Sequence, residues 1–467
     1  MVLTEPLKFA KDFIDQLSEG LKAENPESKL SLKQRFFLSF CITAIILMSS
    51  VCWAEFERAS LGRYTLGGLS WMFRVSHIRW DLLLKNSIKV ILKKYGITEG
   101  VVVVDDSDNP RSKNTTTISQ VHCIKDKKTG GYLKGQNIVF ILFVSNKITF
   151  PIGFGFYEPD PVITAWRKTD KRLKQAGVKK EERPAKPIKN ETYPTKQEVA
   201  FKLLEGFLRD FPTLKVKCVL ADALYGSRDF MSSVSRLFSG IQVISQLRKT
   251  QLVRVGNKNI RLKDYFDKRP ALSEKLTIRG GKEKNVFMIG ARLSVCAHGV
   301  KRAVIALRYE DEEEYRYIVA TNLCWRMTDI ARAYTIRWLV EVFFSDWKLY
   351  EGWCQLAKQP GVDGSCRGVI LSLLTDHALL THEDQFALLE NNLPASTVGS
   401  LRAQLRFDSL CQFIRQLLEA EDPKSQLDEC MKQLHKTMKL SPSGKHLNGR
   451  DLGQLEPAES LKKRYAA

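Results

Sequence analysis

YTIRWLVEVFFSDWK, residues 334–348, contains neither glycine nor proline, and we expect one continuous helix that Thr328 or Asp329 caps at its start. At about 100° per residue, an arc of roughly 60° on the helical wheel collects one acid, one phenol and two cations. These four residues are Tyr334, Arg337, Glu341 and Lys348. The other acid, Asp346, lies about 140° from Glu341 and cannot share that face. A face with one acid among cations suits a site that binds a metal ion and a polyanion together. The alternative interpretation is a surface helix with ordinary side-chain pairs.

Two further acidic positions follow strands of the buried type. Val101–Val104 is four valines in a row, which predicts a central strand, and Asp105 and Asp106 come directly after it. Lys215–Ala221 predicts a second such strand, and Asp222 follows it. Ligands of α/β proteins bind at the carboxyl ends of strands, whereas the simpler interpretation is a polar turn after each strand. Successive strand side chains point to opposite faces, so only one of Asp105 and Asp106 can face a site.

The spacing Y-(2)-R-(3)-E-(6)-K within residues 334–348 resembles the signature of the DDE transposases of bacterial insertion sequences, the cut-and-paste group. The resemblance covers roughly residues 99–390 and implies an α/β fold with a ribonuclease-H-like catalytic core. It also implies that three acids converge as catalytic groups and metal ligands, namely Asp105, Asp222 and Glu341. The first acid of the family typically opens an acid-acid-hydroxyl triplet, here Asp105-Asp106-Ser107, which favours Asp105 over Asp106.

The resemblance further implies a chemistry. Three carboxylates would hold two Mg²⁺ ions about 4 Å apart, with Mn²⁺ able to substitute. Tyr334, Arg337 and Lys348 would bind DNA near the cleaved phosphate. The implied reaction is cleavage at the transposon ends, followed by attack of the freed 3′-hydroxyl on target DNA. Trp325 is a candidate by its position for stabilising a flipped base, and a packed aromatic side chain is the alternative.

The pattern along the chain predicts five regions. They are a helical, DNA-binding N-terminal domain (1–98), the first part of the core (99–248), a β-rich insertion (249–326), the second part of the core with the signature helix (327–390), and a helical C-terminal region (391–467). Within the core we expect a hairpin over residues 137–157, a helix over 197–211 and a further strand over 241–247. The basic connector 165–190 is predicted to be exposed and partly mobile, and it either grips a DNA backbone or is simply solvated.

Charge and cysteine content limit the class of protein. The formal net charge of +21 and the pI of about 9.5 favour a polyanionic partner, most simply double-stranded DNA, while acidic lipid is the competing partner. Lys85, Lys89 and Lys93 form a stripe on an expected helix, either facing phosphates or merely solvated. The ten cysteines include no C-x-x-C pair and predict neither a disulfide framework nor a zinc site. We therefore expect a reduced, cytoplasmic and nucleoid-associated protein.

Residues 36–54 form an uncharged apolar run that is long enough to span a bilayer. A buried helix of a helical domain would have the same hydropathy. Four hydroxyl side chains in the run and the lack of a second such run favour the buried helix, so we expect no membrane partner.

The sequence thus predicts a DNA transposase that acts on transposon ends and target DNA, with two copies in the synaptic complex. Two alternatives share its acids, namely a related DNA nuclease that cuts without joining strands and a catalytically inactive DNA-binding descendant. The inactive alternative is disfavoured because no acid or signature residue is missing. A membrane-associated protein is the remaining alternative.

Overall fold

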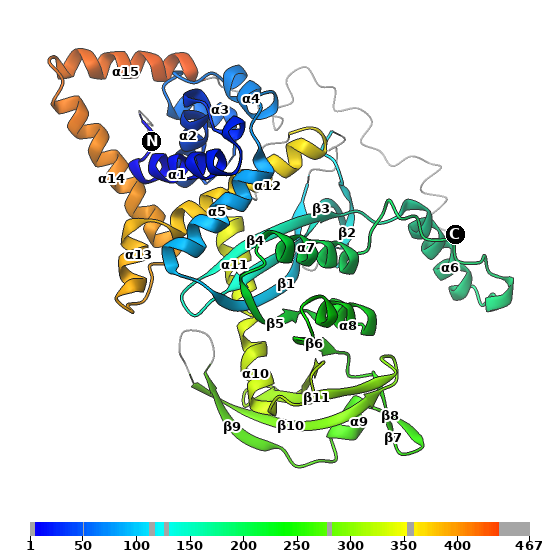
Figure 1. The fold of residues 1–467 in the computed structure, drawn as a ribbon. Helices are drawn as coiled ribbons and strands as arrows, with labels where there is room; N and C mark the ends of the chain where they lie inside the picture. The colour runs from blue at the N-terminus through cyan, green and yellow to red at the C-terminus, as the bar shows by residue number, and fades with distance from the viewer. Residues whose placement is uncertain are drawn as a thin grey trace.

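The computed structural model describes residues 5–49, 51–111, 117–125, 130–277, 283–352 and 359–438, and residues 439–467 of the expected C-terminal region lie outside this part. The helices are α1 (Lys8–Glu24), η1 (Pro26–Ser28), α2 (Leu32–Met48), α3 (Trp53–Ala59), α4 (Leu66–Arg74), α5 (Trp80–Tyr95), α6 (Pro161–Gln175), η2 (Lys180–Glu182), α7 (Lys196–Asp210), η3 (Ala223–Tyr225), α8 (Arg228–Leu237), α9 (Leu262–Phe266), α10 (Met327–Ile336), α11 (Leu339–Tyr350), α12 (Gly361–Leu380), α13 (Glu383–Glu390), α14 (Val398–Leu418) and α15 (Pro423–Thr437). The strands are β1 (Glu99–Pro110), β2 (His122–Lys125), β3 (Tyr132–Val144), β4 (Thr149–Tyr157), β5 (Lys215–Ala221), β6 (Gln242–Leu247), β7 (Leu252–Val255), β8 (Lys258–Arg261), β9 (Leu272–Thr277), β10 (Glu283–Val295), β11 (Val300–Tyr309) and β12 (Arg316–Ala320). The chain is a mixed α/β protein, as the sequence predicts (Figure 1).

The central part of the sheet has the strand order β4-β3-β1-β5-β6. The expected hairpin is confirmed as β3 and β4, and β1, β5 and β6 run parallel. β1 is longer than expected, because its antiparallel pairing with β3 continues to Pro110 while its parallel pairing with β5 ends at Val104. Asp105 and Asp106 therefore lie within a strand, at the point where its neighbour β5 has ended.

The β-rich region predicted over residues 249–326 extends the same sheet. β12 pairs antiparallel with β6, and β11 and β10 continue the sheet outward to β7 and β8, while β9 pairs with β10. Figure 1 shows this part below the central strands, with α10 passing from it toward α11. One twelve-stranded sheet thus connects the central strands to the region before the signature segment.

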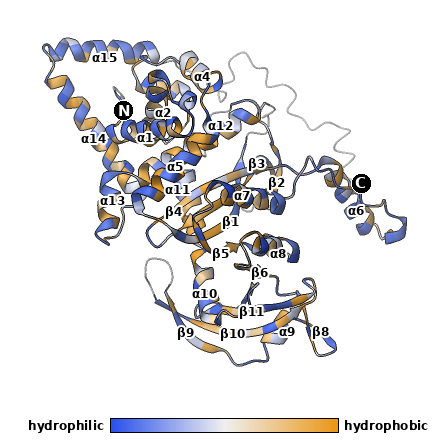
Figure 2. Cartoon of the chain, in the orientation of Figure 1, coloured by the Kyte–Doolittle hydropathy of each residue, from blue (hydrophilic) through white to orange (hydrophobic). Residues whose placement is uncertain are grey.

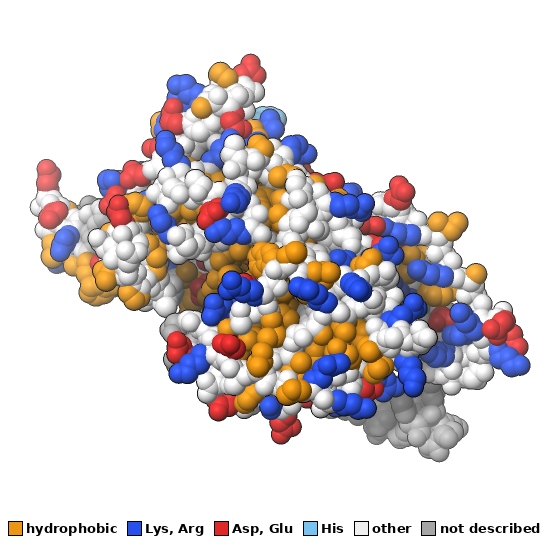
Figure 3. Space-filling view, turned by 60° about the horizontal axis from the view of Figure 1, so that its bottom comes forward, with side chains coloured by type: hydrophobic (Ala, Val, Ile, Leu, Met, Phe, Trp, Pro, Cys, Tyr) orange, Lys and Arg blue, Asp and Glu red, His pale blue; other side chains and the backbone are white. Residues whose placement is uncertain are grey.

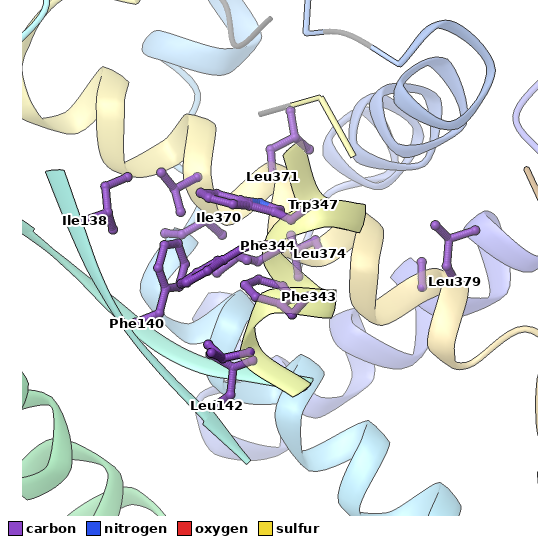
Figure 4. Packing of buried hydrophobic residues seen from close by; sticks show 14 of the residues in the cluster. Ile138, Phe140, Leu142, Phe343, Phe344, Trp347, Ile370, Leu371, Leu374 and Leu379 are labelled. Carbon is purple, nitrogen blue, oxygen red and sulfur yellow. The ribbon is translucent and has the colours of Figure 1, made fainter. Parts of the chain in front are cut away.

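Alternating side chains of the central strands enter two buried layers. Val102 and Val104 belong to the layer that contains α7 and α8, and Val103 belongs to the layer that contains α11 and α12. In the second layer the ring of Phe140 lies edge-on to Trp347 at 4.8 Å between centroids, and Phe343 stacks on Trp347 (Figure 4). Figure 2 shows hydrophobic central strands beside helices of mixed hydropathy. This packing fixes α11 against the sheet that carries the acids.

The apolar run 36–54 does not form the single helix that we expected. α2 ends at Met48, Ser49 adopts a left-handed φ of 59°, and α3 begins at Trp53. Most of α2 is buried among the other helices, and the buried Arg402 of α14 donates to the carbonyl oxygen of Ile46 at 2.9 Å. Among the described residues no single helix has the length and hydropathy of a membrane span, although the bent pair α2 and α3 meets these criteria when taken together.

The basic connector is more structured than expected. It contains the helix α6 and the short turn η2, although α6 buries no residue. The helix that follows begins as predicted, because Thr195 and Glu198 form a capping box at the start of α7. The connector is therefore a helical projection and not only a mobile link between β4 and α7 (Figure 1).

Candidate active site

Two acids meet where neighbouring parallel strands diverge. Val104 of β1 is paired with Ala221 of β5, and Asp105 and Asp222 are the next residues of the two strands. The Asp105 side chain is only 11% exposed, whereas that of Asp222 is 41% exposed. The sheet register alone therefore brings side by side two acids that are far apart in the sequence.

Arg337 links these two acids. Its Nη1 donates to Oδ2 of Asp105 at 2.9 Å and lies 3.9 Å from Oδ1 of Asp222. The guanidinium also lies over the ring of Tyr334, 5.7 Å from its centroid. The Tyr334 hydroxyl in turn donates to Oε1 of Gln246 on β6 at 3.2 Å. Three strands and the signature segment therefore hold one constellation.

The expected continuous helix over residues 334–348 is wrong. α10 ends at Ile336 and α11 begins at Leu339, and tight i to i+3 hydrogen bonds join the two, including 3.1 Å from the Arg337 N–H to the Tyr334 carbonyl. The capping expectation is also wrong, because α10 begins at Met327 with Arg326 as its N-cap residue and no side-chain cap. A tighter turn advances by about 120° per residue, so a straight wheel no longer describes the segment.

Electrostatics at the acid pair favour a cation. Burial raises the pKa of Asp105 to about 7, although Arg337 and the backbone N–H of Asp106 act in the opposite direction. For Arg337, burial lowers the pKa, but the neighbouring Tyr334, Asp105, Asp222 and Glu341 outweigh it, and the pKa is raised overall. Desolvation destabilises the charged form of this buried carboxyl, and the guanidinium of Arg337 beside it offsets only part of that cost.

Asp106 points to different partners. Its Oδ2 accepts from the Lys196 Nζ at 2.7 Å and from the Asn137 Nδ2 at 3.2 Å. The Lys196 ammonium also lies over the ring of Tyr157, 5.4 Å from its centroid. The strand alternation therefore separates the two adjacent acids, with only Asp105 in contact with Arg337.

The loop after Asp222 is held by groups that the sequence reasoning did not identify. Gly226 approaches β6 so closely that an added Cβ would lie 2.6 Å from the Gln246 carbonyl oxygen. The buried His298, on the turn between β10 and β11, shares a hydrogen bond of 3.0 Å with the Gly226 carbonyl through Nε2. Its Nδ1 accepts from Arg302 at 3.2 Å, so Nε2 carries the proton. A polar turn after the strand 215–221 was the simpler interpretation of Asp222, but nothing in the sequence linked this turn to His298.

The remaining predicted residues lie at different places. Glu341 is exposed in the first turn of α11, and its charge contributes to the raised pKa of Arg337. Lys348 lies in the last turn of α11, roughly 14 Å along this helix from its first residue Leu339 at about 1.5 Å per residue, and its ammonium lies over the Phe344 ring. Trp325 is partly buried and packs against the main hydrophobic cluster, in keeping with the alternative of a packed aromatic.

The carboxylates of Asp105 and Asp222 are suitable ligands for a divalent metal, but their side chains are not arranged to bind one together. Carboxylate oxygens are the donors that Mg²⁺ prefers, and the guanidinium between Asp105 and Asp222 occupies a position that favours positive charge. Within the described residues, no group of three or more His, Cys, Asp or Glu side chains is arranged to hold a metal ion. Because Arg337 lies between the two carboxylates, their joint ligation of a metal requires this side chain to move.

A cavity of about 560 Å³ adjoins this constellation. It lies between the α10–α11 junction and the strands β11 and β12, and its lining includes Tyr309, Arg316, Tyr334, Arg337 and Trp338. Figure 3 shows the molecule from below relative to Figure 1, where Lys and Arg side chains border a central area of hydrophobic side chains. Aromatic and cationic groups thus continue from the acid pair onto the sheet extension.

Comparison with known families agrees with this geometry. Residues 67–275 match a family model described as DDE superfamily endonuclease. The match supports a DDE-type transposase or nuclease family and a function of that type, and such enzymes normally use divalent metals and act on DNA. The matched segment contains Asp105 and Asp222 but ends before α10, so it does not cover the signature segment. A search of curated proteins found no match to this chain.

Proposed function

We propose that this chain is a DNA transposase that cleaves transposon ends and joins the freed 3′-hydroxyl to target DNA. The observation that carries the proposal is the link between Asp105, Arg337 and Asp222. It combines two acids on neighbouring parallel strands with the arginine of the Y-R-E-K segment. The strand order β4-β3-β1-β5-β6 supports a ribonuclease-H-like core, with β7–β12 as its insertion.

Asp105, Asp222 and Glu341 are the residues that would hold Mg²⁺ in this proposal. Their hard oxygen atoms suit the ion, and the raised pKa of Asp105 is the property of a carboxylate that needs a positive partner. When bound, divalent ions supply charge stabilisation for the attacking and leaving oxygens of the phosphodiester. DDE-type enzymes normally use such metals, which supports this assignment.

Arg337 has two successive partners in the proposed reaction. In the protein alone it neutralises Asp105 and Asp222. A DNA phosphate offers the guanidinium a bidentate anionic partner, and the exchange would release both acids for metal. Tyr334, anchored by Gln246, orients the guanidinium, and Lys348 would contact the backbone further along α11.

The proposal is tested with duplex DNA taken from the sequences that border the gene, with Mg²⁺ present. A transposase nicks this DNA at one position and transfers the pre-cleaved 3′-hydroxyl end into a second duplex. Cleavage without transfer would assign the chain to the related nucleases. Binding without cleavage would instead identify an inactive descendant. Because two ends must be cut together, we expect two copies of the chain on a paired-end substrate.

Glu341→Gln tests the third acid. We expect cleavage to fall by at least 100-fold, because a carboxylate ligand is replaced by a neutral amide, while DNA affinity stays within about twofold since the cationic groups remain. The measurements are single-turnover cleavage and duplex binding in EDTA. Glu383→Gln, an exposed acid on α13, is the matched control. If Glu341→Gln retains Mg²⁺-dependent cleavage, Glu341 is not a metal ligand of the site.

A further inference from the structure

The strongest unassigned feature is a projection, here called the basic arm, formed by residues 161–190. It comprises α6, η2 and the chain that returns from them to α7 (Figure 1). Ten Lys or Arg stand here against three Asp or Glu, a net charge of +7, which is a third of the +21 of the whole chain. A charge density of this size on a segment that buries no helical residue indicates an external partner.

The arm has an inner and an outer side. On the inner side Nε1 of Trp166 donates to the Pro184 carbonyl at 2.8 Å, and Arg183 pairs with Asp170 at 2.8 Å. These contacts hold the returning chain against α6. Asp170 is the acid of α6, and its ion pair with Arg183 lies on the inner side of the arm. It therefore does not neutralise the cations on the outer side.

The outer side of α6 carries five exposed cations with no acidic partner among the described residues. They are Arg167, Lys168, Lys171, Arg172 and Lys174. Residues spaced by three and four lie on one helical face, so the set forms two adjacent rows. From the first to the last, the rows extend for about 10 Å, which corresponds to roughly three nucleotide steps of a DNA strand.

The base of the arm is fixed next to the acid site. Both ends of the arm are joined by Asp160, whose Oδ1 accepts from the Val162 N–H at 2.8 Å and whose Oδ2 accepts from the Asn190 N–H at 3.3 Å. Shortly after the arm, Lys196 contacts Asp106, the neighbour of Asp105 on β1. The root of the arm therefore lies at the same point along β1 as Asp105, on the opposite side of the strand from Arg337.

We propose that the outer face of α6 binds the phosphate backbone of duplex DNA flanking the cleaved position. The inference rests on the proposed function, since the same duplex occupies the acid site. Long cationic side chains on a solvated helix suit sequence-independent phosphate contacts. The arm therefore contributes affinity and orientation, and no base readout.

The test compares two variants with equal loss of charge. The arm variant replaces Arg167, Lys168, Lys171, Arg172 and Lys174 by Gln. The control variant replaces five exposed cations of α14 and α15 by Gln, namely Arg406, Arg415, Lys424, Lys432 and Lys436. Binding of a 40-bp duplex is measured in EDTA at several salt concentrations, so that cleavage does not contribute.

We expect the arm variant to bind about tenfold or more weakly at 0.15 M salt, with a salt slope shallower by about 2 to 3, as two to three phosphate contacts are lost. The control variant should keep the wild-type slope. In the wild-type protein, duplex DNA should protect Lys168, Lys171 and Lys174 from acetylation, and leave Lys424 and Lys432 reactive. Because α6 buries no residue, the arm variant should melt at the wild-type temperature.

Several outcomes would overturn the inference. Equal losses in the two variants would mean that net charge alone matters. If the arm variant keeps the salt slope of duplex binding while the wild-type protein cleaves DNA, the arm does not contact the duplex. The proposed function would then still stand. A changed oligomeric state with normal DNA binding would assign the arm to a second copy of the chain. A wild-type protein that binds no duplex would overturn the inference and the proposed function together.

Discussion

At the scale of single residues, one position along β1 separates two very different acids. Asp105 faces Arg337 and Asp222, and its pKa is raised to about 7 mainly by burial. Asp106 faces Lys196 and Asn137 on the other side of the strand. Both are aspartates in one triplet, so the pleat of the strand decides which of them meets Arg337 and Asp222.

Asp105→Asn and Asp106→Asn should therefore have different effects. We expect Asp105→Asn to lower single-turnover cleavage by at least 100-fold, because it removes a proposed ligand. Asp106→Asn should keep cleavage within about tenfold and lower the free energy of unfolding by about 1–3 kcal/mol, because the partly buried Lys196 loses its anionic partner. Cleavage rates and urea melts check both expectations. Loss of cleavage only in Asp106→Asn would reverse the assignment of the two acids.

At the scale of elements, the junctions of α11 decide what its side chains reach. At its start, the tight turn after α10 places Arg337 over the acid pair. Along its length, Trp347 packs against Phe140 of β3 and fixes the helix on the sheet. At its end, the fully buried Glu351 lies beside Asp376 of α12, and the Ser372 hydroxyl donates to the Glu351 carbonyl at 2.5 Å.

The Glu351–Asp376 pair should make stability depend on pH. Burial and then Asp376 raise the pKa of Glu351 well above its usual range, and burial raises the pKa of Asp376 to about 7. The folded state therefore holds more protons than the unfolded state above pH ~4, so stability falls as pH rises from ~4 through 7, by up to about 1.4 kcal/mol per pH unit for each group.

Asp376→Asn tests this expectation. Its free energy of unfolding should decline less steeply than that of the wild type between pH 5 and 8, because one buried group no longer ionises. Asp363→Asn, an exposed acid in the same helix, should follow the wild-type curve. Urea melts at four pH values are the measurement. Parallel curves for the wild type and Asp376→Asn would show that this pair does not titrate with unfolding.

At the scale of the whole molecule, the two main features are a single twelve-stranded sheet and a large positive net charge. The sheet runs from β2 and β4 through the central strands to β7 and β8, so the two acids, the signature segment and the sheet extension form one scaffold. The main hydrophobic cluster contains residues from α1 to α14, which ties the N-terminal helices to the same body. The net charge of +21 adds a long-range attraction for DNA that falls with salt.

Lys348→Ala should reduce this salt dependence by a defined amount. If its ammonium contacts one phosphate, the slope of log K against log salt becomes shallower by about 0.9. Lys424→Ala on α15 has the same change in net charge and should leave the slope unchanged. Duplex binding at five salt concentrations in EDTA is the measurement. An unchanged slope in Lys348→Ala would exclude this side chain from the interface.

Local patterns in the sequence determined most of the elements. The valine run predicted the central strand, the apolar stretch 215–221 predicted β5 without error, and the expected hairpin and the helix α7 are present. Such features depend on neighbours in the chain, through β-propensity, capping and short turns. The Y-R-E-K spacing also singled out Tyr334 and Arg337, whose side chains are in contact with each other, and Arg337 in turn contacts Asp105.

Only the tertiary structure decided how those elements meet. The break between α10 and α11 is invisible in a sequence without glycine or proline, because packing of Trp347 and the contact of Arg337 with Asp105 determine where each half lies. The same holds for Asp106 with Lys196 and for His298 with Gly226, which are 90 and 72 residues apart. Contacts over such separations depend on strand register and desolvation, and neither quantity is written in a local pattern.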